Sequence, residues 1–378
     1  MSTGEKSGTA FGRQVARERG RRKWSLRDLA AHSGLSHSRI RRIETDPERE
    51  ITLEDVLVLA DAFGVPASWL VRGAAVRDRV LAAARARDTE NAEAAVDQIV
   101  HVLELAQQLD SIANVDSPGM SVSAMPRVGT ETTREWGRAK AESIRRAAGY
   151  TSGPIQDLAS FIEEHTGAFV VIDDLPPNVD GVSLRDPETG YAVVAASTAL
   201  PWERQRFTLA HELGHLVAGE MMVEEVSSQA GNHRETAAHE FARNLLIPTG
   251  DLEPTKADEG WTAMDAARVA WRYRVSPQVV GIQLERAGIG NRRLTDELAQ
   301  VSAEAWSGIG GWAPERGSLA AAASMRRIPP LLADRALEAW RNSRIPAATI
   351  GRLLNYSTEQ VESLLKEVGI EQDRAFVD

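Results

Sequence analysis

The chain of 378 residues contains no cysteine, which excludes a disulfide framework and any metal site built from thiolates. No apolar run reaches the roughly 20 residues that a membrane-spanning helix needs, and residues 1–10 lack the apolar core of a secretory signal. We therefore expect a cytoplasmic protein with no membrane partner. The length predicts about two to four domains, and 43% hydrophobic residues supply enough apolar material for their cores.

Acidic residues outnumber basic residues over the whole chain. The net charge is -10, which argues against a protein that coats nucleic acid along its whole length. The distribution is uneven, however, because residues 1–44 hold eleven Lys and Arg residues against four acids. A basic patch confined to one small segment is typical of a domain that binds nucleic acid. A basic helical bundle that binds protein is the alternative.

Within this basic segment, residues 25–44 predict a helix, a tight turn and a second helix. Ser25 is placed to cap the first helix, and Gly34 permits the turn. The second helix would present short polar groups and arginines at its start, which suit base edges and phosphates of the major groove. The candidate DNA-binding residues are Ser36, His37, Ser38, Arg39 and Arg42.

This pattern resembles the Cro/repressor (XRE) family of helix-turn-helix domains over residues 9–72. The resemblance implies an N-terminal five-helix bundle that binds a double-stranded DNA operator. Further helices are expected near residues 52–63 and 66–71. Where that family often uses Gln to contact adenine, this chain has His37, so the operator sequence does not follow from the resemblance.

The most informative stretch is residues 206–217, an apolar, helix-forming run that contains His211, Glu212 and His215. Residues four apart point from one face of a helix, so the two imidazoles can bind one zinc-like ion at about 2.0–2.1 Å. Glu212 lies about 100° around the helix and is placed to take a proton from water rather than to bind the metal. This arrangement is typical of a metallopeptidase.

A third ligand is available in residues 232–248, a predicted helix that stops near Pro248. Glu235 and His239 are four apart on it and share a face. The Glu235 carboxylate would complete a three-ligand site and leave a fourth position for water. His239 is an alternative ligand or an outer partner of the ligands. The alternative for Glu235 is a solvated charge near a helix start.

Two flanking runs extend this signature, namely Arg206-Phe207-Thr208-Leu209-Ala210 and Phe241-Ala242-x-x-Leu245-Leu246-Ile247-Pro248. With them the chain resembles the ImmA/IrrE family of metallopeptidases over residues 135–290. The resemblance places the third ligand at Glu235, six residues before the Phe-Ala pair. It implies a gluzincin-like metalloendopeptidase that cuts helix-turn-helix repressors in stress or mobile-element responses. The family usually has Asn or Asp where this chain has His239.

The metal is expected to be Zn²⁺, with Mn²⁺ or Fe²⁺ as alternatives, because His/His/Glu sites do not select strongly between these ions. Glu212 is the expected catalytic base. His233 and His239 are candidates for stabilising the oxyanion that forms on the peptide carbonyl.

The resulting fold prediction is a multidomain, mainly helical chain. Its expected parts are a helix-turn-helix domain at 9–72, a helical connector at 74–114, a linker at 116–130, an α+β zincin-like peptidase domain with a small sheet at 133–290, and a helical, helix-turn-helix-like C-terminal domain at 291–378. Strands are expected at 168–172, 181–184 and 191–195, the last as a candidate edge for an extended substrate. Residues 308–311 are expected to form a loop.

The connector carries two apolar stripes at helical spacing, Val96/Ile99/Leu103/Ala106 and Val102/Leu105/Leu109/Ile112. It is either a dimer helix, since repressors that read two half-sites form homodimers, or a helix packed on its own peptidase domain. The predicted function is a DNA-binding regulator whose metallopeptidase cleaves a repressor-type protein, in trans or within its own linker. The alternative is a transcription factor whose peptidase-like domain is catalytically silent and serves as a sensor or interaction module.

Overall fold

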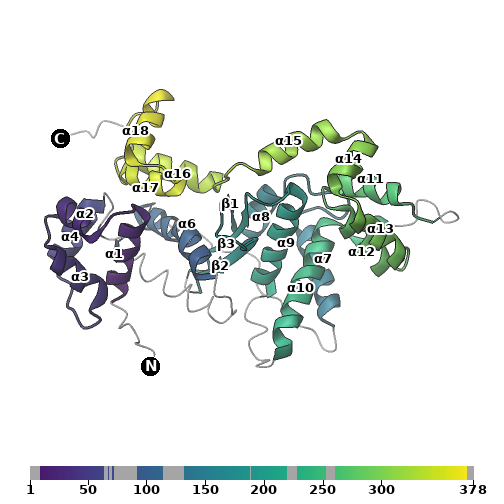
Figure 1. The fold of residues 1–378 in the computed structure, drawn as a ribbon, viewed down its shortest axis with the longest axis horizontal. Coiled ribbons are helices and arrows are strands. Elements are labelled where there is room, and N and C mark those ends of the chain that lie inside the picture. The colour runs from purple at the N-terminus through teal and green to yellow at the C-terminus, as the bar shows by residue number, and fades with distance from the viewer. Residues whose placement is uncertain are drawn as a thin grey trace. The chain divides into compact units, whose positions relative to one another are not determined.

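The fold is that of a computed structural model (Figure 1), which describes residues 9–63, 67, 70–71, 92–113, 132–187, 189–218, 228–252 and 260–372. Contacts divide the chain into two units, one made of residues 1–117, 186–189 and 328–378 and the other of residues 118–185 and 190–327. The predicted linker at 116–130 lies outside the described residues. The predicted C-terminal domain at 291–378 is divided between the two units.

The basic N-terminal segment forms the predicted helix-turn-helix. Its described helices are α1 (Ala10–Arg21), α2 (Leu26–Ser33), α3 (His37–Thr45) and α4 (Leu53–Phe63). Ser25 makes a reciprocal capping box with Asp28 at the start of α2, and Gly34 ends that helix with a positive φ of 69°. Arg19 of α1 donates to both carboxylate oxygens of Glu44 on α3 at 2.8 and 2.7 Å, which fixes the orientation of α3. The expected fifth helix lies mostly outside the described residues.

The long connector helix α6 (Ala92–Ala113) belongs to the same unit as the helix-turn-helix domain. It packs against two C-terminal helices, α16 (Pro330–Arg341) and α17 (Ala347–Leu354), and Arg335 of α16 ion-pairs with Asp110. Both predicted apolar stripes are buried within the chain, apart from the half-buried Ile112. Dimerisation through α6 therefore stays a prediction.

The small sheet has the strand order β1-β3-β2, formed by β1 (Phe169–Asp173), β2 (Gly181–Arg185) and β3 (Ala192–Ser197). β3 pairs in parallel with β1 and antiparallel with β2. The expectation that residues 191–195 form an edge for substrate is therefore wrong, because a strand with partners on both sides has no backbone groups left to pair. On β1, Ile172 exchanges two backbone hydrogen bonds with Arg327.

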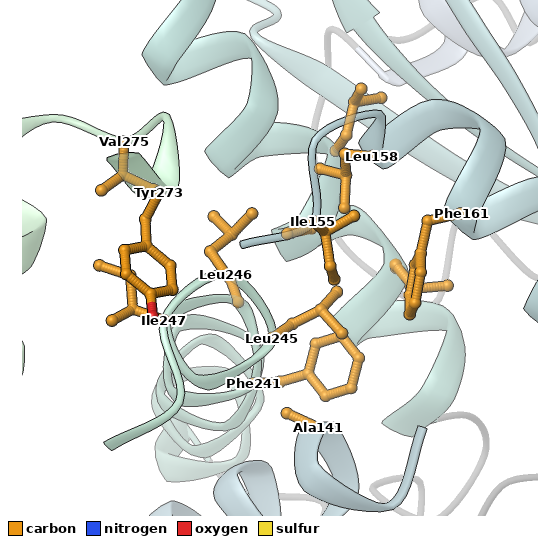
Figure 2. Packing of buried hydrophobic residues seen from close by; sticks show 14 of the residues in the cluster. Ala141, Ile155, Leu158, Phe161, Phe241, Leu245, Leu246, Ile247, Tyr273 and Val275 are labelled. Atoms are coloured by element: carbon orange, nitrogen blue, oxygen red, sulfur yellow. The ribbon is translucent and has the colours of Figure 1, made fainter. Parts of the chain in front are cut away.

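Four helices join this sheet in the hydrophobic core of the second unit. They are α7 (Thr133–Ala147), α8 (Leu158–Thr166), α9 (Trp202–Ala218) and α10 (Ser228–Leu246). α10 lies between α7 and α9 and packs against both (Figure 1). Figure 2 shows Phe241 and Leu245 of α10 pointing toward Ala141 and Ile155, while Ile247 lies beside Tyr273. These apolar contacts fix α10 against α7 and against the segments around Ile155 and Tyr273.

The remaining helices complete the two units. In the second unit they are the 3₁₀ turn η2 (Thr249–Leu252), α11 (Ala263–Tyr273), α12 (Pro277–Arg286), α13 (Arg292–Gln300), α14 (Ala303–Gly310) and α15 (Ala313–Ala323), and in the first unit α18 (Thr358–Glu367) follows α17. The expected loop at residues 308–311 is wrong in part. Gly308 and Gly310 belong to the last turn of α14, and only Gly311, with a φ of 81°, ends the helix. Among the described helices, none combines the length and apolarity that crossing a membrane requires.

A half-buried arginine anchors the start of α9. Arg206 donates to the carbonyl oxygens of Ile155 at 2.6 Å, Gln156 at 3.0 Å and Arg274 at 3.0 Å. Burial lowers the pKa of Arg206 to about 10, which leaves it cationic at neutral pH. This side chain therefore joins α9 to the segments that precede α8 and follow α11, and it holds the helix that carries the histidine pair.

Candidate metal centre

The histidine pair lies on the face of α9 that points toward α10. Leu209, Leu213 and Leu216 of α9 are buried in the core, which leaves the opposite face for the imidazoles. The Nε2 atoms of His211 and His215 are 3.0 Å apart, as predicted for residues four apart on a helix. Both side chains are largely shielded from solvent, at 14% and 19% exposure.

α10 brings the predicted carboxylate to this pair. The two oxygens of Glu235 lie 3.3 Å from His211 Nε2 and 3.2 Å from His215 Nε2. Ligands at about 2.0–2.1 Å around a tetrahedral ion are about 3.4 Å from one another, so the three groups have the spacing that a divalent ion requires. Hydrogen bonds from His211 and His215 hold the pKa of Glu235 well below its usual range, so the carboxylate is anionic at neutral pH.

A glycine sets the distance between the two helices at this point. Gly214 lies on α9 between the histidines, and a Cβ atom there would come within 3.0 Å of Ala238 Cα and 3.1 Å of Phe241 Cδ1 on α10. Any larger residue would push α10 outward by a few tenths of an ångström. The close approach of Glu235 to His211 and His215 therefore depends on Gly214.

We expect Gly214→Ala to weaken Zn²⁺ binding by about 10- to 100-fold, the range observed when a ligand loses its outer support. The added methyl group separates α10 from α9 and moves the carboxylate away from the imidazoles. Competition with a chromophoric chelator measures the affinity. Gly308→Ala is the matched control, because a Cβ atom there meets no other atom within 4 Å. Equal affinities in the two variants would show that the separation of α9 and α10 does not control the affinity for Zn²⁺.

Glu212 lies on α9 between the two histidines, with its side chain half-buried. Strand β2 passes close to it, since a Cβ atom on Gly181 would be 3.1 Å from Glu212 Cγ and 2.4 Å from Thr208 Cγ2. Sequence reasoning missed Gly181. The sequence signal for it is a glycine at the start of a strand, which can indicate that another element packs closely there.

The two further histidines are placed differently. His239 lies one turn after Glu235 on α10, and its ring centroid is 4.4 Å from that of His211. His211, Glu235 and His239 each offer a ligand atom within 4.8 Å of the others. His233 is half-buried on the same helix, and no contact among the described residues brings it to this group.

The predicted DNA-binding residues lie at the start of α3, where Ser36 caps the helix by accepting from Arg39 N at 3.2 Å. His37, Ser38 and Arg42 are exposed. Arg41 is also exposed, and it is four residues after His37, so it shares that residue's face. Sequence reasoning left Arg41 out, although the same helical spacing could have found it.

Arg39 is engaged inside its own domain. Its Nε donates to Asp55 Oδ1 on α4 at 2.8 Å, and the Asp55 side chain is fully buried. Burial acts to raise the pKa of Asp55, but hydrogen bonds from Thr52 and Arg39 outweigh it and hold that pKa below its usual value. This arrangement favours a role for Arg39 in fixing α3 against α4.

We expect Arg39→Ala to lower the melting temperature of the chain's helix-turn-helix domain, because buried Asp55 loses its closest cation and keeps the more distant Arg49, at 3.5 Å. Arg42→Ala should leave the melting temperature unchanged and weaken DNA binding, with the salt slope reduced by about 1. Thermal unfolding and fluorescence anisotropy with duplex DNA measure the two effects.

The pKa of Asp55 is depressed in the folded chain, so the stability contributed by the Arg39–Asp55 pair depends on pH. That stability is present above the pKa that Asp55 has in the unfolded chain, and it is lost as the pH falls through the pKa that Asp55 has in the folded chain. An Arg39→Ala chain that melts normally but fails to bind DNA would restore Arg39 as a DNA contact.

Comparisons with known families agree with both resemblances. Residues 15–70 match the helix-turn-helix family model, and residues 163–285 match the M78 peptidase model, described as the IrrE N-terminal-like domain. No curated protein matches the chain. The chain thus combines a DNA-binding helix-turn-helix domain with a domain of a metallopeptidase family, in that order, and it is a regulator with a peptidase-like domain. The match to the peptidase model includes the histidine pair on α9 and Glu235 on α10.

Proposed function

We propose that this chain is a DNA-binding transcription regulator with an intrinsic metal-dependent endopeptidase. The observation that carries the proposal is the convergence of His211 Nε2, His215 Nε2 and the Glu235 carboxylate within 3.0–3.3 Å of one another. Glu212 stands between the two histidines on the same helix. Zn²⁺ is the proposed ion, with Mn²⁺ or Fe²⁺ as alternatives, because two imidazoles and a carboxylate bind all three.

The roles of the side chains follow from their chemistry. His211, His215 and Glu235 would hold the metal, which when bound supplies the Lewis acidity that activates water and polarises a peptide carbonyl. Glu212 accepts one proton from the attacking water as the water oxygen bonds to the carbonyl carbon. Glu212 then delivers that proton to the leaving amine as the C–N bond breaks. The Glu235 side chain is 56% exposed, so the site opens to solvent, where a protein substrate can reach it.

The substrate we propose is a repressor of the helix-turn-helix type, cleaved in response to stress or to a mobile element. The support for this class is the pairing of a DNA-binding domain with an IrrE-like domain on one chain. Cleavage in trans is the first candidate, and cleavage of the chain's own segment at 116–130 is the second. The second would separate the DNA-binding domain from the peptidase domain. A homodimer that reads two half-sites would then lose the avidity of two linked domains.

The test follows the mass of the purified full chain during incubation with Zn²⁺ or Mn²⁺, alone and with a candidate repressor. Loss of the repressor with wild type but not with Glu212→Gln supports cleavage in trans. A fragment that ends between residues 116 and 130, absent from Glu212→Gln, supports self-cleavage. If both proteins stay whole although metal and DNA are bound, the peptidase-like domain is catalytically silent and acts as a sensor.

A further inference from the structure

His239 lies beside His211 and Glu235 of the metal centre. It is the residue four positions after Glu235, so the two helices contribute matching pairs, His211/His215 from α9 and Glu235/His239 from α10. Its ring is 4.4 Å from that of His211 and inclined to it by 68°. Phe207, one turn before His211, lies 5.9 Å from the His239 ring. His239 is therefore on the same side of α10 as the ligands.

The hydrogen bond of His239 leaves one of its nitrogens available. Nδ1 lies 2.7 Å from the backbone carbonyl oxygen of Glu235. A carbonyl oxygen accepts only, so Nδ1 carries the proton and Nε2 keeps its lone pair. Metal-bound imidazoles commonly donate their second nitrogen in this way, to a backbone carbonyl or a carboxylate. An Asn or Asp at this position would offer no imidazole nitrogen.

From this arrangement we propose that His239 is a fourth protein ligand, so that three imidazoles and one carboxylate can close the metal site of this chain. The inference rests on the proposed metal centre and adds one residue to it. Sites with four protein ligands are closed, whereas catalytic sites keep one position open for water or substrate. Wild type therefore hydrolyses peptides below its full rate, because the peptidase is latent in molecules whose His239 is bound.

His239 is also the donor best placed to leave. The inner three donor atoms are 3.0–3.3 Å apart, whereas the set formed by His211, Glu235 and His239 spans up to 4.8 Å. Its side chain is 44% exposed, against 14% and 19% for His211 and His215. A rotation of this outer side chain opens the fourth position without disturbing the other three ligands.

The experiment counts imidazole ligands by X-ray absorption on the Zn²⁺-loaded full chain. We expect three imidazoles in wild type and two in His239→Asn, with the affinity for Zn²⁺ reduced by more than about 100-fold, which exceeds the usual loss when an outer partner is removed. His233→Asn is the matched control, since it removes another histidine from α10 and should leave the count at three. A count that falls in His233→Asn instead would overturn the assignment.

Peptide hydrolysis at saturating Zn²⁺ is the second readout. His239→Asn should increase the rate, because the variant opens the position that His239 closes. An unchanged count of two imidazoles in wild type and variant, with a lower rate in the variant, would overturn the proposal and assign His239 to the oxyanion. If wild type binds no metal at all, the proposed metal centre itself fails, which the count shows without any activity measurement.

Discussion

Glu212→Gln is expected to lower the rate of peptide hydrolysis by about 10²–10⁴-fold, the usual contribution of a positioned general base. The amide has nearly the same shape as the carboxylate but cannot accept the proton of the attacking water. Metal content and DNA binding should not change, since Glu212 is neither one of the proposed ligands nor part of the helix-turn-helix domain. The rate is measured on the same protein substrate for both chains at equal Zn²⁺ occupancy.

Glu164→Gln is the control for this substitution, because it removes an exposed carboxylate from α8 of the same unit. It should leave the rate as it is in wild type. A Glu212→Gln chain that keeps its rate to within about tenfold would fall below the contribution expected of a general base. Glu212 would then not be the base, and the role assigned to α9 would be wrong.

Glu235→Ala should remove the metal. The carboxylate is the only anionic member of the proposed ligands, and without it only imidazoles remain. We expect the affinity for Zn²⁺ to fall by more than about 100-fold, since a direct ligand contributes more than an outer partner. Elemental analysis after dialysis against a weak chelator measures the loss. Glu212→Gln serves as the comparison, because it should lose activity and keep its metal, whereas Glu235→Ala should lose both.

Full metal occupancy in Glu235→Ala would contradict this assignment. The third ligand would then be His239, which is the alternative that the spacing on α10 also allows. Loss of the metal from His239→Ala together with its retention in Glu235→Ala would show that His239, and not Glu235, is the third ligand.

Local signals in the sequence were sufficient for much of the fold and for the inner donors. The spacing of His211 and His215 predicts two nitrogens on one helical face, and the structure places them 3.0 Å apart. Ser25 and Gly34 predict a helix start and a helix end, and they occupy those positions. Such signals act within one or two turns, so a short window of sequence contains all the interactions that decide them.

Contacts between distant segments could not be predicted in this way. The position of β3 in the centre of the sheet depends on pairing with two strands, and nothing within residues 192–197 encodes which strands these are. Arg39 reads as a DNA contact from its place in α3, but its partner Asp55 lies 16 residues away. The stripes of α6 allow either a dimer contact or packing within the chain, and nothing within residues 92–113 encodes that α16 and α17, more than 200 residues later, pack against this helix.

The approach of α10 to α9 is the most consequential feature of this kind. Glu235 approaches His211 and His215 because Gly214 lets the two helices pack closely. The sequence shows a glycine inside a helix, which normally costs about 1 kcal/mol relative to alanine. That local cost is a hint of a packing role, but the partner on α10 is visible only in three dimensions.

We propose that the peptidase-like domain cuts proteins by means of the α9/α10 metal centre. The most direct measurement adds the Zn²⁺-loaded full chain, as wild type or Glu212→Gln, to a lysate of cells that normally produce this chain and identifies new protein N-termini by mass spectrometry. We predict new N-termini in a helix-turn-helix protein with wild type only, and none after chelation of the metal. Identical N-termini in the wild-type and Glu212→Gln samples, with metal and DNA bound by both chains, would contradict the claim.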